Sequence, residues 1–164
     1  PLSSTAPALA SPSLKSSMLI SGMADTVFGY DFGLGVGNIV CQAHAFSVIN
    51  AYGFSAGPPN VKKRVVGITG GGHMVPTDLC QTNLQGRNAL QEAISSGVCG
   101  GNFGMVPSLF DCGSPGFDWK TGVRAIAYAS TAALEETLMC KDRTAAFANM
   151  RARVPVIGDF REAK

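Results

Sequence analysis

His73 is one of two histidines in the 164-residue sequence, and the three glycines 70–72 come directly before it. The run Val65–Ile68 that precedes the glycines has the β-branched, apolar composition of a buried strand. Glycine tolerates backbone angles closed to other residues, so such a loop can bring main chain close to another surface. A histidine presented in this way suits a general base, which must be held in place and still be reached by a proton donor. The alternative is a loop histidine bonded to nearby backbone.

Asp25 occupies a comparable place after a second apolar run, Met18–Ile20, which ends at Ser21 and Gly22. A run this short and this apolar is typical of a strand inside a parallel sheet that is covered on both faces. In open α/β sheets, ligands and catalytic groups gather beyond the carboxyl ends of the strands. Asp25 is therefore a candidate catalytic residue, and the capping of a turn is the alternative.

Ser55 lies in G-F-S-A-G, residues 53–57, which fits the G-x-S-x-G pattern of a nucleophile elbow. That motif needs a strand before the serine and a helix directly after it. Here Pro58 and Pro59 follow, and Pro59 disfavours helical angles at the residue before it. Ser55 is a candidate nucleophile, and the alternative is a surface turn that leads into the strand expected from about residue 62.

The composition predicts a single globular core. Hydrophobic residues make up 46% of the chain and charged residues 15%, which argues against disorder. Thirteen basic residues nearly balance eleven acidic ones, so the sequence implies no nucleic-acid or membrane-surface partner. Its apolar runs all fall well short of the roughly 18 residues that a transmembrane helix needs.

The five cysteines are widely spaced, and the sequence contains no C-x-x-C pair, which argues against a zinc knuckle. Two disulfide bonds and one free thiol would suit an oxidising compartment and favour an extracellular or periplasmic location. The alternative of five reduced, mostly buried thiols remains open. The cysteines are Cys41, Cys80, Cys99, Cys112 and Cys140, and the last four are the favoured partners in bridges.

The remaining elements follow from apolar spacing. Helices are predicted over Ile39–Asn50, Leu79–Ser96, Lys120–Cys140 and Ala145–Arg153, with Gly97 as a stop signal and His44 as a packing residue in the first of them. The fold class expected is α/β. Residues 1–16 are rich in proline, serine and alanine and resemble a linker that enters a domain from a longer protein, whereas residues 81–164 are expected to form a mainly helical extension or cap.

The segments M-L-I-S-G-M-A-D-T-V (18–27) and V-V-G-I-T-G-G-G-H-M-V-P (65–76) together resemble the C-terminal half of an α/β-hydrolase. In that family the acid follows one late strand and the histidine follows the next. Asp25 matches the acid and His73 the histidine, with 73 − 25 = 48 residues between them. The second segment is also similar to the histidine segment of serine carboxypeptidases and to that of secreted esterases and polyester hydrolases. The resemblance covers residues 14–80.

The resemblance implies a Ser-His-Asp triad that hydrolyses esters by acyl transfer to water, without a cofactor or a metal. The family's nucleophile precedes its acid, and only 24 residues precede Asp25. An upstream segment or a partner chain is therefore expected to supply the serine, unless Ser55 acts in a permuted order. The substrate would be a small ester or peptide. The alternatives are a peptidase like the serine carboxypeptidases and a non-catalytic binding or structural module.

Overall fold

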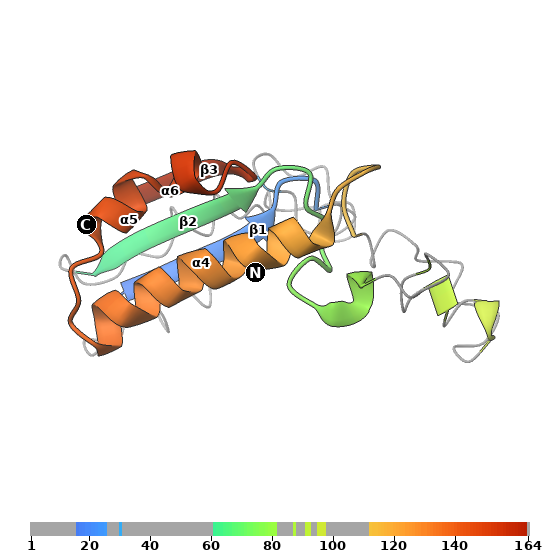
Figure 1. Ribbon diagram of the computed structural model, residues 1–164, viewed down its shortest axis with the longest axis horizontal. Coiled ribbons are helices and arrows are strands. Elements are labelled where there is room, and N and C mark those ends of the chain that lie inside the picture. The colour runs from blue at the N-terminus through green and yellow to red at the C-terminus, as the bar shows by residue number, and fades with distance from the viewer. Residues whose placement is uncertain are drawn as a thin grey trace, which may run out of the picture.

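The computed structural model describes residues 16–25, 30, 61–81, 87, 91–92, 95–97 and 112–163. Within these residues, a three-stranded sheet with the order β1-β2-β3 is covered on one face by helices (Figure 1). Strands β1 (Ser16–Gly22) and β2 (Lys62–Ile68) are parallel, and β3 (Ile157–Ala163) runs antiparallel to β2. The fold is therefore of the α/β class with a small mixed sheet.

Strand β2 forms the centre of this sheet, and its carboxyl-terminal half is apolar toward both faces. Val65 and Val66 are fully buried, and Ile68 is 1% exposed. Such a continuous apolar run is what a strand needs when both faces of its sheet are covered. Its first residue, Lys62, confirms the predicted start. The register pairs Gly22 with Ile68, so β1 and β2 end side by side.

Helix α4 (Trp119–Leu138) confirms the helix predicted over 120–140. The carboxylate of Asp118 caps its start by accepting a hydrogen bond from the backbone N–H of Lys120 at 3.1 Å. Small side chains at helical spacing let the helix lie close against β1 and β2, as Figure 1 shows. The buried residues of α4 are Gly122, Ala125, Ala129 and Ala132, and they share the core with Val66 and Ile68.

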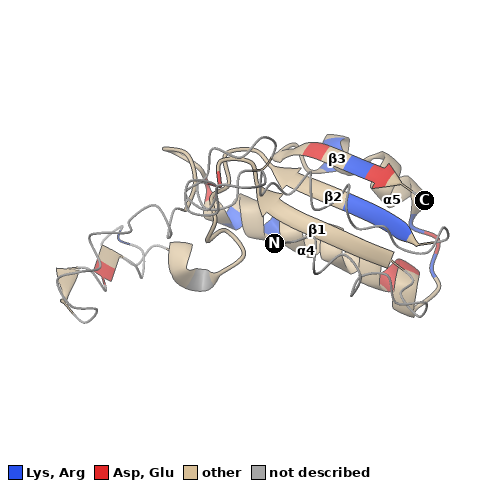
Figure 2. Ribbon diagram, turned by 180° about the vertical axis from the view of Figure 1, so that it is seen from behind, with Lys and Arg blue, Asp and Glu red and all other residues tan. Residues whose placement is uncertain are grey.

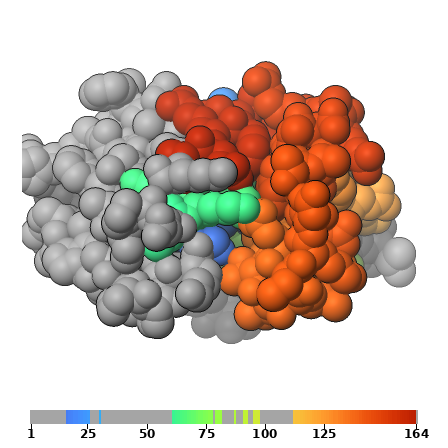
Figure 3. Space-filling model, turned by 90° about the vertical axis from the view of Figure 1, so that its left-hand side faces the viewer, coloured from blue at the N-terminus to red at the C-terminus, as the bar shows by residue number. Residues whose placement is uncertain are grey.

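The helix predicted over 145–153 is present as two short helices, α5 (Thr144–Ala148) and α6 (Met150–Arg153), which meet at Asn149. Phe147 of α5 is 4% exposed and stacks on Phe160 of β3 with 5.9 Å between ring centroids. Strand β3 was not predicted, and it places residues 157–163 in the sheet rather than in a helical layer outside it. Viewed from the end where β2 begins, the residues of β2 lie against α4 and the C-terminal segment (Figure 3).

A charged cluster joins the amino-terminal half of β2 to its neighbours. Arg64 is 1% exposed, and its guanidinium donates to Glu162 of β3 at 2.5 Å and to Glu136 of α4 at 2.7 Å. The same guanidinium lies 3.7 Å from the ring centroid of Phe147. Lys62 also donates to Glu136, at 2.6 Å. Figure 2 shows the basic residues on β2 beside the alternating charges of β3.

Other predicted elements are described only in part. Residues Asp78–Cys80 form a short 3-10 helix, η3. Of the helix predicted over 79–96, helical conformation is present at residues 91–92 and 95, whereas residues 79–80 belong to the 3-10 helix and residues 81 and 87 are not helical. The left-handed Gly97 (φ 68°) lies where a stop was predicted. The predictions for residues 1–15, the helix over 39–50, His44 and Ser55 lie outside the described residues. Among the helices that the structure describes, none is both long and apolar enough to cross a bilayer.

Candidate active site

Asp25 and His73 lie together at the carboxyl ends of β1 and β2. The Nδ1 atom of His73 is 3.0 Å from Oδ2 of Asp25. The Asp25 side chain is 5% exposed, whereas 28% of the His73 side chain is exposed. The carboxylate is thus shielded from water while the imidazole stays accessible, which is the arrangement that an orienting acid and a working base require.

The two loops that carry this pair are bonded through their main chains. The N–H of Met23 donates to the carbonyl of Ile68 at 2.8 Å, and the N–H of Ala24 donates to the carbonyl of Gly71 at 2.9 Å. Gly22 permits this approach, because a Cβ atom at that position would lie 2.1 Å from the carbonyl oxygen of Gly71. A side chain at residue 22 would force the acid loop and the histidine loop apart.

The histidine loop turns sharply before His73. Gly70 has φ 73°, a left-handed conformation that favours glycine. The N–H of Gly71 then donates back to the carbonyl of Ile68 at 3.1 Å. Beyond the histidine, Val75 is fully buried. It packs closely on α4, because a Cβ atom added at Gly122 would lie only 2.8 Å from its side chain. His73 therefore lies between a constrained turn and an apolar anchor.

A third segment, Cys112–Ser114, contacts the same loop. A disulfide joins Cys80 to Cys112, with 5.5 Å between their Cα atoms. Gly113 forms an isolated antiparallel bridge with Gly71, and the N–H of Ser114 donates to the carbonyl of Gly70 at 2.8 Å. Sequence reasoning named both cysteines as bridge candidates but did not place this segment at the site.

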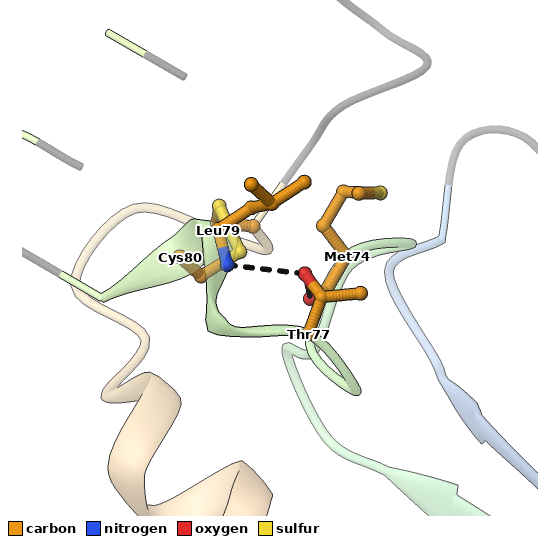
Figure 4. The surroundings of a disulfide bond; sticks show 5 residues. Met74, Thr77, Leu79 and Cys80 are labelled. Atoms are coloured by element: carbon orange, nitrogen blue, oxygen red, sulfur yellow. Dashed lines mark hydrogen bonds between the residues drawn. A yellow bond between two sulfur atoms is a disulfide. The ribbon is translucent and has the colours of Figure 1, made fainter. Parts of the chain in front are cut away.

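Figure 4 shows the disulfide beside the turn that follows His73. The hydroxyl of Thr77 donates to the carbonyl of Met74 at 2.8 Å, and it accepts from the N–H of Leu79 at 3.3 Å. The turn therefore leads directly from the histidine to Cys80. Cys140, by contrast, is exposed with a free thiol, which contradicts its predicted place in a bridge. Cys41 and Cys99 lie outside the described residues.

The arrangement determines which nitrogen of the imidazole can act as a base. An ionised carboxylate only accepts hydrogen bonds, so opposite Asp25 the Nδ1 atom of His73 is the protonated nitrogen and donates the hydrogen bond. In the neutral ring, Nε2 is then the basic nitrogen. In the part of the chain that the structure describes, His, Cys, Asp and Glu form no cluster of three or more that would hold a metal ion.

Comparisons with known proteins add no relative. No family model matches the sequence, and searches of curated proteins and of solved structures return no significant match.

Proposed function

We propose that the protein is a serine hydrolase of the α/β-hydrolase type and that this chain supplies the acid and the base of its triad. The observation that carries the proposal is the 3.0 Å contact between Asp25 and His73 at the ends of two adjacent parallel strands. Two motifs that are 48 residues apart in sequence thus meet at the edge of the sheet where catalytic groups gather. A loop histidine that is 28% exposed needs no buried carboxylate to be stable, whereas a buried carboxylate at Nδ1 is what orients the base of a Ser-His-Asp triad.

The chemistry follows from the orientation of the imidazole. Nε2 of His73 takes the proton of a serine hydroxyl as its oxygen attacks the ester carbonyl carbon, and returns that proton to the departing alcohol. Water then attacks the acyl-enzyme, with His73 accepting a proton from the water and giving it back to the serine oxygen as the acid product leaves. Asp25 keeps Nδ1 protonated and stabilises the imidazolium that forms in each step.

The serine is proposed to come from an upstream segment or from a partner chain, with Ser55 as the candidate inside this chain. A fluorophosphonate probe forms a covalent bond only with an activated serine, so peptide mapping of the labelled protein identifies the nucleophile. Label on Ser55 would establish the permuted order. Label on another segment or chain would establish the triad as a joint site.

The substrate class is proposed to be small carboxylic esters. An esterase and a peptidase would use the same acid and base, so only their substrates can distinguish them. Hydrolysis of short-chain nitrophenyl esters indicates an esterase, and hydrolysis of blocked dipeptides indicates a peptidase. A non-catalytic module predicts neither activity. Widely separated side chains would favour that alternative, whereas Asp25 and His73 lie within hydrogen-bond distance of each other.

The decisive experiment replaces His73 by Gln in the protein isolated together with any chain bound to it. Ester hydrolysis should fall by about 10³-fold or more if His73 is the general base. The matched control is His44→Gln, which removes the chain's other histidine. Equal activity in wild type and His73→Gln would refute the proposal.

A further inference from the structure

We propose that Cys112–Ser114, here called the brace, is a positioning element for the base: it fixes the loop that carries His73, so that the imidazole stays on Asp25. This inference rests on the proposed function, because it assigns the brace a role in that same site. It goes beyond the triad by naming residues some forty positions away in sequence that determine how well the base is oriented.

The first observation is that the brace adds main-chain contacts to the start of the histidine loop. Gly113 bridges Gly71, and the N–H of Ser114 donates to the carbonyl of Gly70 at 2.8 Å. Gly71 is also the residue whose carbonyl accepts from Ala24 in the acid loop. The three segments therefore meet at one peptide, and a shift of the brace would be transmitted to both members of the Asp25–His73 pair.

The second observation is that the contact leaves no space for a side chain. Gly113 has φ 120°, which favours glycine, and a Cβ atom there would lie 2.2 Å from the carbonyl oxygen of Gly70. It would also lie 3.0 Å from the backbone nitrogen of Gly72, the residue directly before the histidine. Glycine at position 113 thus permits the closest approach between the brace and the loop.

The third observation is that the brace also holds the far end of the loop. Ser114 and Gly113 contact Gly70 and Gly71 before His73, whereas Cys112 is bonded to Cys80 after it. The histidine is therefore part of a ring closed by hydrogen bonds on one side and by a disulfide on the other. Closing both ends restricts the conformations of the loop, and keeping a base within a fraction of an ångström of its productive position is what such restriction provides.

Gly113→Ala is the variant that tests the brace, and Gly116→Ala is its matched control. Gly116 has a positive φ of 82° like Gly113, but a Cβ atom there would meet nothing within 4 Å. Both substitutions place a side chain on a backbone with positive φ, yet only the first pushes on the histidine loop. We expect kcat for ester hydrolysis to fall about 10- to 100-fold in Gly113→Ala, with KM within about twofold of wild type. Gly116→Ala should keep the wild-type kcat.

A spectroscopic readout separates positioning from general destabilisation. A histidine Nδ1 proton shared with a carboxylate gives a separate downfield NMR signal, and His73→Gln identifies it in a chain with two histidines. This signal should weaken or broaden in Gly113→Ala at a temperature where the thermal unfolding curve shows the variant to be folded. It should persist in Gly116→Ala.

Removal of the disulfide provides a second variant in case Gly113→Ala does not fold. The double substitution Cys80→Ser/Cys112→Ser should lower kcat and weaken the same NMR signal, whereas Cys140→Ser, which changes a free exposed thiol, should do neither. The inference is overturned if Gly113→Ala matches Gly116→Ala in kcat and in the NMR signal, or, for a Gly113→Ala that does not fold, if the double variant keeps both. Equal hydrolysis in wild type and His73→Gln would instead refute the proposed function, and the NMR signal would then still test the brace.

Discussion

The two ends of β2 are held in opposite ways. At the amino end, side chains make the connections: Arg64 joins two carboxylates from α4 and β3 while lying over an aromatic ring. At the carboxyl end, main chain makes them, through carbonyl and N–H groups brought together at Gly22, Gly71 and Gly113. The loops at this end are held mainly by backbone, and they bring the side chains of Asp25 and His73 together.

The comparison is tested most severely by Asp25→Asn. An amide preserves the shape but does not hold the imidazole in the tautomer that leaves Nε2 basic, so kcat should drop by about 10⁴-fold. The melting temperature should change little, because the backbone contacts of the loops remain. Steady-state kinetics and a thermal melt measure the two effects, with Asp159→Asn on β3 as the control. A wild-type kcat in Asp25→Asn would contradict the assignment of the acid.

Arg64→Met tests the other end of β2. The variant leaves Glu136 and Glu162 without their shared partner and should destabilise the fold by about 3 kcal/mol, near the low end for a broken buried ion pair because both carboxylates are partly exposed. Activity per folded molecule should remain. Urea unfolding monitored by circular dichroism gives the free energy, and Arg161→Met, which loses a more exposed pair with Asp159, is the control. A loss of kcat without a loss of stability would show that Arg64 supports activity rather than the fold.

Gly22→Ala sharpens the comparison at the carboxyl end. The added methyl group would lie 2.1 Å from the carbonyl oxygen of Gly71, so the acid and histidine loops must separate. Displacement by a fraction of an ångström to one ångström should lower kcat by up to about 100-fold. Gly116→Ala, whose methyl group meets open space, is again the control. Kinetics indistinguishable from wild type would show that the backbone contact does not position the pair.

The smallest expected effect is on acid stability. Burial raises the pKa of Glu136, but the hydrogen bonds and positive charges of Lys62 and Arg64 together outweigh it, so the pKa lies below the ordinary value of 4.5. Its contribution to stability is therefore complete above pH 4.5 and is lost as the pH falls through the lowered pKa. Glu136→Gln should flatten the fall in melting temperature below pH 4.5 relative to wild type. An unchanged pH dependence would show that other carboxylates account for it.

Local patterns in the sequence predict much of this fold. The apolar runs Met18–Ile20 and Val65–Ile68 identify β1 and β2, although β1 is only partly buried and β2 begins with three basic residues. Apolar residues at helical spacing identify α4, because this signal also lies within one segment of the sequence. Strand β3 has no such signal: it begins I-G-D-F and is placed by its pairing with β2 and by the contact of Glu162 with Arg64.

The candidate site, like the fold, can be predicted from the sequence only in part. Asp25 and His73 can be predicted because each follows its own strand, and parallel strands bring their carboxyl ends together. The brace cannot, since its contact joins Gly71 to Gly113, which are 113 − 71 = 42 residues apart. Nothing in the local composition of either glycine-rich segment encodes that pairing, and five cysteines permit many connectivities.

Strand β3 forms one edge of the three-stranded sheet, and its residues determine whether a further strand could pair there. Its exposed Arg161 and Glu162 make it a poor template for another strand, since charged edges discourage further pairing. Within the described residues, β1 forms the opposite border, and its own loop delivers the acid. Under the proposed function, a strand that brought a serine to His73 would join on the β1 side, where the acid loop lies.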